Sequence, residues 1–385
     1  FTLNLSEDLS RRDFTVNALT LDKKGNIIDL FDGKKALEKR LIKAVGKADA
    51  RFGEDALRML RAVRLTAELN SPVVSPNKKW RIDSKTLEAI KKNAGWIQAI
   101  AKERIRDELI KMIMSDEPEE AIEMLKETGL LKYIIPELEK GIGVSQNRHH
   151  IYTIYQHLVL SLKFAAKRKY NLEVRLAALF HDIAKPQTKR GEGEDSTFYN
   201  HDIVGARFTA NILQRLKFPK KTIEKVAHLV RNHMFVYGVD EVSEAGVRRL
   251  LQRVGRENMK DLLKLRIADR LGSGCPKAVP YKLRHLEYLI EKVSNDPISV
   301  KMLKINGNDL MKILEIKPGP RLGLILDALL AEALENPEIN TKKKLSEKAK
   351  ALNKLTDQEL KKKDKIVKEK KEEVDLEMKT KHWVK

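Results

Sequence analysis

The chain has 385 residues, of which 42% are hydrophobic and 5% aromatic, and a formal net charge of +21 at pH 7. This length favours two or three domains, and the positive charge favours RNA or DNA as a partner, contacted through phosphates by Lys and Arg rather than through aromatic stacking platforms. The chain has one cysteine, which excludes a disulfide framework and a cysteine-based zinc site. It has no signal-peptide pattern and no apolar run near ~18 residues, which predicts a cytoplasmic protein with no membrane contact.

Residues 1 to about 50 have the pattern of α/β structure. The opening stretch FTLNL alternates as a strand does. FTVNALTL and NIIDLF lie on either side of DKKG, which predicts a hairpin across a glycine-containing turn.

From Arg51 onward the apolar spacing is helical. Two prolines in SPVVSPNKKWRI interrupt the helices, which resume in ERIRDELIKMIMS and PEEAIEMLKETGLL. Pro136 and GIGVSQNRHH mark a predicted domain boundary, and the lysine-rich end predicts a charged helix or a disordered arm. We therefore predict a mainly α fold that begins with part of an α/β domain. Its predicted segments are 1–50, 51–140, 149–274, 275–345 and 346–385.

The stretch RFGEDALRMLRAVR, at residues 51–64, carries charged residues at every third position. These are Asp55, Arg58, Arg61 and Arg64. Residues three apart are neighbours on a helix, and Leu57, Leu60 and Val63 form a second stripe that can pack inward. Taken alone, the charged stripe favours surface ion pairs over a ligand site.

Four motifs in order change that interpretation. They are EDLSRRDFTVNA, D-x-x-x-x-x-I-D-L-F-D-G, RFGEDALRMLRAVR and ERIRDEL. With them the chain resembles the bacterial tRNA nucleotidyltransferase and poly(A) polymerase family, from residue 1 to about 345. The resemblance implies an enzyme that adds or repairs the CCA end of tRNA from CTP and ATP with Mg²⁺. It also implies a helical neck at 51–140 and a helical tRNA-binding tail at 275–345. A poly(A) polymerase of the same family is an alternative.

The resemblance places Asp55 and Arg58 against the incoming base. Cytosine and adenine both present an amine beside an unprotonated ring nitrogen, so a carboxylate can accept from the first and a guanidinium donate to the second. Uracil and guanine would leave these groups unpaired and be rejected. The remaining nucleotide-binding residues that it implies, for the nucleotide and its triphosphate, are Arg12, Arg61 and Arg64. Asp13 would orient the loop near the ribose or have a structural role only.

Two motifs of this family do not occur. The family holds two metal ions with a D-x-D pair and places a Gly-Gly-x-x-Arg-Asp turn against the phosphates, yet no two aspartates here are two positions apart. Because the chain starts at Phe1 in a predicted strand, we expect roughly 80–100 residues of a catalytic head to precede it in the parent protein. The chain is then expected to bind RNA without incorporating nucleotides.

A second series of residues favours a metal site. It comprises His157, His181, Asp182, His201, His233 and Asp269. Each lies on or at the end of an apolar helical stretch, so the side chains can converge inside a helical bundle. Buried histidines beside carboxylates need a partner, and a divalent metal supplies one. The alternative for any single histidine is a satisfied core residue.

This series resembles the HD metal-dependent phosphohydrolase superfamily. The resemblance implies that His157, His181, Asp182 and Asp269 are core metal ligands, and that His201 and His233 hold a second metal or contact phosphate. Lys185, one turn after the His-Asp pair, would contact a phosphate oxygen. A divalent transition metal such as Ni²⁺ or Mn²⁺ would then support hydrolysis of a phosphomonoester or a 2′,3′-cyclic phosphodiester. The sequence is also consistent with a stand-alone HD phosphohydrolase acting on RNA ends, or with a non-enzymatic RNA-binding protein.

Overall fold

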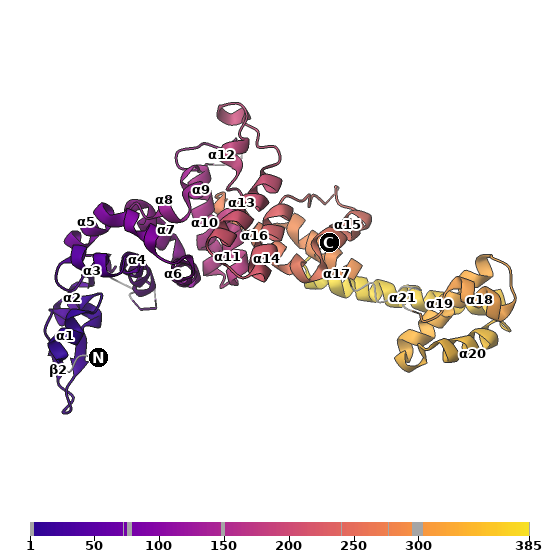
Figure 1. Ribbon diagram of the computed structural model, residues 1–385. Coiled ribbons are helices and arrows are strands. Elements are labelled where there is room, and N and C mark those ends of the chain that lie inside the picture. Colours follow the sequence, from indigo (N-terminus) through magenta and orange to yellow (C-terminus); the bar gives the residue numbers. More distant parts are fainter. Residues whose placement is uncertain are drawn as a thin grey trace. The chain divides into compact units, whose positions relative to one another are not determined.

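The computed structural model describes residues 4–71, 73–74, 79–147, 151–239, 241–275, 277–294 and 303–384. The described residues are mainly helical, with two two-stranded sheets, so the predicted fold class is confirmed (Figure 1). The chain forms two compact units. Unit 1 comprises Phe1–Phe235 with Glu257–Ala278, and unit 2 comprises Val236–Arg256 with Val279–Lys385.

Unit 1 begins with a helix where the sequence pattern predicted a strand. Residues 1–3 lie outside the described residues, and helix α1 spans Leu5–Ser10. The Asn4 side chain accepts a hydrogen bond from the Ser6 amide at 3.0 Å, and two acidic residues follow in the first turn. This N-cap stabilises a helix in a stretch whose alternation alone indicates a strand, so the prediction is wrong at Leu5.

The predicted hairpin is confirmed. Strands β1 (Leu19–Leu21) and β2 (Ile27–Asp29) pair antiparallel, and Gly25 in the turn has φ +82°. The Asp29 carboxylate accepts from the amides of Gly33 and Lys34 at 2.8 and 2.9 Å, which starts helix α2 (Gly33–Lys39). A second sheet pairs β3 (Leu41–Ile42) with β4 (Arg81–Ile82) in parallel, which the sequence did not indicate.

Helices then follow as predicted. They are α3 (Ala48–Glu54), α4 (Leu57–Leu69), α5 (Ser84–Asn93), α6 (Lys102–Met114), α7 (Pro118–Glu127), α8 (Leu131–Ile134) and α9 (Pro136–Glu139), with a 3₁₀ helix, η2, at Ala94–Ala99. The apolar stripe of α4 packs inward, with Leu57 at 5%, Leu60 at 1% and Val63 at 0% exposure. The charged stripe is therefore left on the other side of α4.

The rest of unit 1 is a helical bundle. It consists of α10 (Ile154–Lys167), α11 (Leu172–Phe180), α12 (Lys185–Thr188), α13 (His201–Arg215), α14 (Lys220–Asn232) and α16 (Arg256–Gly272). Helix α16 lies close to α10 because Gly272 has no side chain: a Cβ there would overlap the Ser161 Oγ. This close approach positions the polar end of α16 beside α10.

Arg175 of α11 joins the bundle to the end of α6. Its guanidinium, 2% exposed as a residue, donates to the carbonyls of Tyr170, Ile113 and Ser115 at 2.8–2.9 Å. Arg175→Met leaves these carbonyls, one buried and two partly buried, without their charged donor, so we expect a loss of about 3 kcal/mol in the free energy of unfolding. Urea unfolding measures it. Arg168→Met, at an exposed position, is the matched control and should change stability by less than about 0.5 kcal/mol; equal losses would contradict this role for Arg175.

Unit 2 is helical throughout its described residues. It contains α15 (Glu244–Val254), α17 (Tyr281–Ser294), α18 (Gly307–Leu314), α19 (Pro320–Glu335), α20 (Lys342–Leu352) and α21 (Asp357–Lys381). The predicted segment 149–274 thus includes one helix, α15, that belongs to unit 2.

The lysine-rich end is a helix, α21, that packs on α17. Burial raises the pKa of Asp375, but hydrogen bonds from Tyr288, Lys379 and Lys292 lower it to about 2. The carboxylate accepts from Lys292 Nζ at 3.1 Å and also from the Tyr288 hydroxyl. The charged residues of α21 are therefore in part a structural contact, and the helical alternative of the prediction is the one observed.

Candidate nucleotide-binding and metal sites

Asp55 lies between α3 and α4, where its carboxylate accepts from the first amide of α4 and pairs with an arginine of α6. Its Oδ1 accepts from the Leu57 amide at 3.1 Å, and Arg104 of α6 donates to Oδ1 and Oδ2 at 3.2 and 2.8 Å. Burial raises the pKa of Asp55, but the hydrogen bonds from Arg104 and Leu57 outweigh it, so the pKa lies below its ordinary value. Asp55 is thus an ionised acceptor held in one orientation.

The predicted arginines have carboxylate or carbonyl partners near Asp55. Arg58 donates to Glu54 Oε2 at 2.9 Å and to the Arg11 carbonyl at 2.8 Å. Arg61 pairs with Asp13, from Nε to Oδ2 at 2.7 Å, and Asp13 is 8% exposed. Asp13 therefore holds Arg61 in place, in addition to accepting from the Phe14 amide at 2.9 Å.

A cavity of about 520 Å³ brings these residues together. Its lining is Arg12, Asp13, Asn17, Asp55, Leu57, Arg58, Arg61 and Arg104. Arg64 is not in this lining: it pairs with Glu108 at 2.6 Å and Glu68 at 2.8 Å on the side of α4 facing α6. Arg104 is the residue that the sequence interpretation did not single out, although it lies within the quoted motif ERIRDEL.

The second series converges in the bundle. His157 is on α10, His181 and Asp182 follow α11, and His201 begins α13. His233 follows α14 and Asp269 is on α16. All six residues are buried, none more than 8% exposed. The structure therefore brings together every residue of this predicted set.

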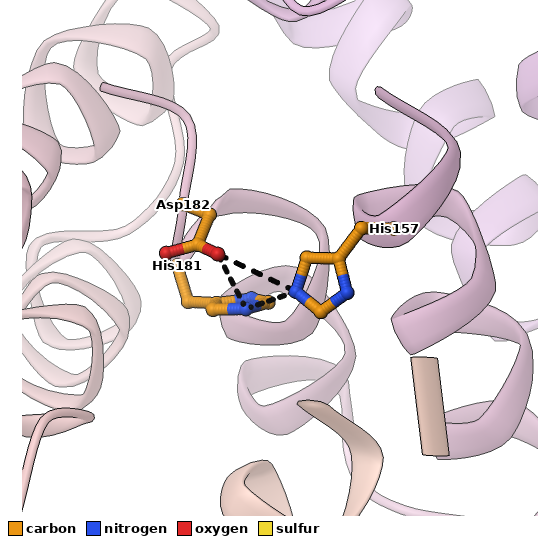
Figure 2. A group of neighbouring side chains, drawn as sticks. All are labelled: His157, His181 and Asp182. Atoms are coloured by element: carbon orange, nitrogen blue, oxygen red, sulfur yellow. Dashed lines mark hydrogen bonds and ion pairs between the residues drawn. The ribbon is translucent and has the colours of Figure 1, made fainter. Parts of the chain in front are cut away.

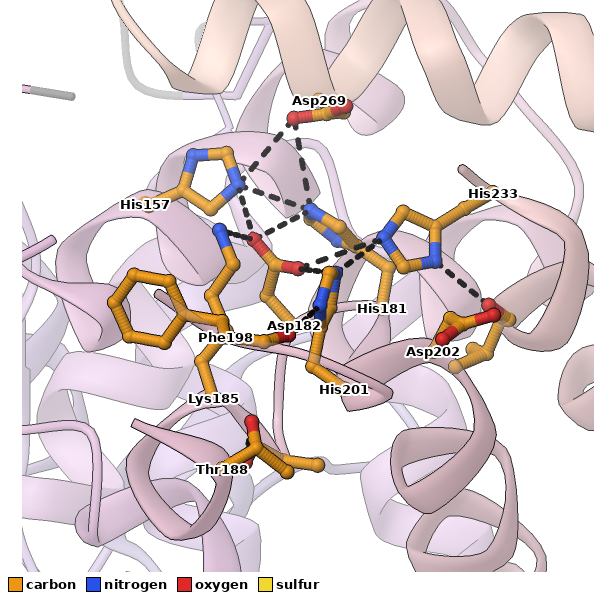
Figure 3. A network of polar contacts seen from close by, with 12 residues as sticks. His157, His181, Asp182, Lys185, Thr188, Phe198, His201, Asp202, His233 and Asp269 are labelled. Atoms are coloured by element: carbon orange, nitrogen blue, oxygen red, sulfur yellow. Dashed lines mark hydrogen bonds and ion pairs between the residues drawn. The ribbon is translucent and has the colours of Figure 1, made fainter. Parts of the chain in front are cut away.

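Two groups share the Asp182 carboxylate. In the first, Nε2 of His157 and Nε2 of His181 are 2.9 Å apart and lie 3.4 and 3.5 Å from Asp182 Oδ2 (Figure 2). Asp269 Oδ1 adds to this group at 3.4 and 3.6 Å from the same nitrogens. In the second, Nε2 of His201 and Nε2 of His233 lie 3.4 and 3.5 Å from Asp182 Oδ1 (Figure 3).

The second group has a donor set that could hold a metal ion. Nδ1 of His201 and of His233 lie 2.6 and 2.7 Å from the carbonyls of Phe198 and Val230, which can only accept, so each Nδ1 carries the proton. Burial lowers the pKa of His201 more than the Asp182 charge raises it, which favours neutral imidazole. The two Nε2 atoms face each other at 3.3 Å, next to the buried Asp182 Oδ1, which accepts no hydrogen bond from the described residues. These three ligand atoms lie close enough together to coordinate one metal ion.

Ionised carboxylates fit the same conclusion. Burial raises the pKa of Asp182, but the charges of Lys185 and His181 hold it well below its usual range. Burial likewise raises the pKa of Asp269, and the hydrogen bond and charge of His181 lower it well below that range. Two acids and four imidazoles form a donor set suited to divalent transition metals.

Lys185 contacts Asp182 at the wall of a cavity. Its Nζ donates to Asp182 Oδ2 at 2.6 Å and to Gln146 Oε1 at 2.7 Å, and lies 5.3 Å from the centre of the Phe198 ring (Figure 3). It also lines a cavity of about 660 Å³, together with His181, Asp182, His201, His233 and Asp269. Gln146 lies in GIGVSQNRHH, which the sequence marked only as a boundary.

Comparisons with known proteins agree with one another. Residues 1–43 match the poly A polymerase head domain, 80–142 a probable RNA and SrmB-binding site of polymerase A, and 202–349 a putative domain 2 of tRNA nucleotidyltransferase. The chain is 33% identical to the A-adding tRNA nucleotidyltransferase of Deinococcus radiodurans, over 88% of this chain and 77% of that one. It is 34% identical to the CC-adding tRNA nucleotidyltransferase of Thermus thermophilus, over 88% and 75%.

A solved structure is similar over most of the chain. The Bacillus stearothermophilus CCA-adding enzyme in complex with CTP superimposes with a TM-score of 0.53 and 26% identity, covering 92% of this chain and 76% of that one.

Among the described residues no helix is long and apolar enough to span a bilayer.

Proposed function

The chain belongs to the tRNA nucleotidyltransferase and poly(A) polymerase family, and from this we propose that it binds tRNA, CTP and ATP in adding or repairing the 3′-terminal CCA. Members of this family use divalent metal, and we propose Mg²⁺ for nucleotidyl transfer. We also propose that segment 149–274 is an HD phosphohydrolase domain, following a head at 1–50 and a neck at 51–140, with a tRNA-binding tail at 275–345. Segment 346–385 has no proposed ligand.

For the nucleotide, the proposal depends on the cavity around Asp55. Asp55 supplies an ionised acceptor and Arg58 a donor beside it, the pair needed to favour cytosine and adenine. Arg12 and Arg61 line the same cavity and can offer charge to a triphosphate. The relatives named A-adding and CC-adding support a narrower candidate, a protein that uses ATP or CTP alone. A poly(A) polymerase would select ATP in the same way.

For the bundle, one observation carries the proposal. A single buried carboxylate, Asp182, directs one oxygen at each of two histidine pairs, with His157 and His181 near Oδ2 and His201 and His233 near Oδ1. Held there, Mn²⁺ or Ni²⁺ would supply Lewis acidity toward a phosphoryl oxygen and increase the acidity of water. Lys185, fixed by Asp182 and Gln146 in the cavity wall, offers positive charge to the phosphate. RNA ends with a 3′-phosphate or a 2′,3′-cyclic phosphate are the proposed substrates.

The experiment uses the whole chain stripped of metal by a chelator. With Mn²⁺ or Ni²⁺ restored, we expect hydrolysis of 2′,3′-cyclic CMP and of an RNA ending in a 3′-phosphate, and none without metal. Product is followed by release of inorganic phosphate or opening of the cyclic ester. Tight binding of both metals without turnover of either substrate would contradict the phosphohydrolase proposal and leave a structural metal site.

A further inference from the structure

A second cavity adjoins the first at the Asp55–Arg104 pair. It measures about 610 Å³, and both members of the pair line it as well as the first cavity. Its remaining lining is Phe52, Gly53, Glu54, Ala56, Trp96, Ala99 and Ile100. The first cavity is thus lined by guanidinium groups, and the second mainly by apolar and aromatic groups. They adjoin at one ion pair.

Trp96 is the exposed aromatic residue of this wall. Trp96 is 44% exposed as a residue, whereas Phe52, in the same wall, is 1% exposed. Trp96 lies on η2, and its ring packs near the backbone of Gly53, where a Cβ would stand 3.7 Å from the ring atom Cζ3. An indole that lies near backbone on one side and is partly exposed to solvent can offer a stacking surface for a planar ring.

The position of the nucleotide decides what such a surface would bind. Arg58, which the proposed base selection requires together with Asp55, lines only the first cavity. The incoming base is therefore assigned to the first cavity, which leaves the second open for a neighbouring planar group. In nucleotide addition the neighbour of the incoming nucleotide is the end of the RNA to which it is joined. The family match to an RNA-binding site, residues 80–142, includes Trp96.

We propose that Trp96 stacks against the unpaired 3′-terminal base of the acceptor RNA and thereby positions that end beside the nucleotide held at Asp55. This inference depends on the proposed nucleotide and RNA binding. It assigns one residue a stacking role in a chain whose low aromatic content argued against stacking platforms in general. The ligand is a nucleobase of single-stranded RNA, recognised by its planar face rather than by sequence.

The test compares two RNA hairpins in equilibrium binding to the full chain. One has a blunt acceptor stem, and the other has the same stem with two unpaired 3′ nucleotides. Trp96→Ala should weaken binding of the overhang RNA about tenfold, with the blunt RNA and free CTP or ATP unchanged. Trp96→Phe should retain most of the affinity. The matched control is Trp383→Ala, at a tryptophan of unit 2 that is 80% exposed, and it should change neither RNA.

Three outcomes would overturn the inference. Equal loss on both RNAs would assign Trp96 a general or structural role, and unchanged overhang binding would remove the stacking contact. Loss of CTP binding in Trp96→Ala, with the thermal unfolding temperature kept, would place the incoming nucleotide in this cavity instead. If the unmodified chain binds neither RNA, the proposed function itself fails, and that result is separate because no variant is needed to see it.

Discussion

Asp182→Asn will abolish metal binding in the helical bundle and, with it, the proposed phosphohydrolase activity. Asp182 gives one oxygen to each histidine pair, so a neutral amide removes the charge from both groups at once. It also places an NH₂ group against the imidazole nitrogens of one pair. This group donates hydrogen bonds and cannot coordinate a cation. We expect at least about 100-fold weaker Mn²⁺ or Ni²⁺ binding by calorimetry, and loss of turnover of 2′,3′-cyclic CMP in the same samples.

The matched control is Asp202→Asn. Asp202 lines the same cavity and is one residue from His201, but it pairs with Arg231 and belongs to neither metal group. We expect its metal affinity to stay within about threefold of the unmodified chain. Full metal binding by Asp182→Asn, or equal losses in both variants, would show that the six residues form a hydrogen-bonded core without a metal.

The sequence predicted the convergence of the six residues in the bundle because of where they lie. His157 and Asp269 lie within apolar helical stretches, while His181, His201 and His233 lie at helix ends. Helical spacing is readable from sequence, and buried polar residues in such stretches need partners. The sequence did not reveal that the two Asp182 oxygens face different histidine pairs, because that depends on how four helices pack.

The lining of the cavity around Asp55, the candidate nucleotide site, was predicted less completely, for a different reason. The three-residue spacing identified one stripe on α4, but a stripe drifts around the helix by about 60° per step. Because of this drift, the side chain of Arg64, the last residue of the stripe, faces Glu108 of α6 and does not line the cavity. Arg104 arrives from α6, 49 residues from Asp55 in the sequence, and no local spacing connects the two.

Asp55→Asn will reduce the preference for CTP and ATP over UTP and GTP by about 10- to 100-fold, measured as equilibrium binding of each nucleotide with Mg²⁺. The carboxylate only accepts hydrogen bonds, whereas the asparagine amide also donates and can pair with the carbonyls of uracil and guanine. The substitution keeps an oxygen for the Leu57 amide. The loss should therefore appear in the ratio of affinities, with overall helix content unchanged by circular dichroism.

The control makes the same substitution at an acid near Asp55 in the sequence. It distinguishes recognition of the base by Asp55 from an effect of removing any one negative charge. Asp49→Asn, on α3, removes a carboxylate that pairs with Lys92 and Asn93 and does not line the cavity, so the ratio should stay constant. Burial raises the pKa of Asp55, but the hydrogen bonds from Arg104 and Leu57 lower it below its ordinary value of ~3.9. The Asp55 carboxylate is therefore ionised from pH 5 to 8, and the ratio of nucleotide affinities should be constant over that range. If Asp55→Asn keeps the full preference, the Arg104 pair is a structural contact and the base is read elsewhere.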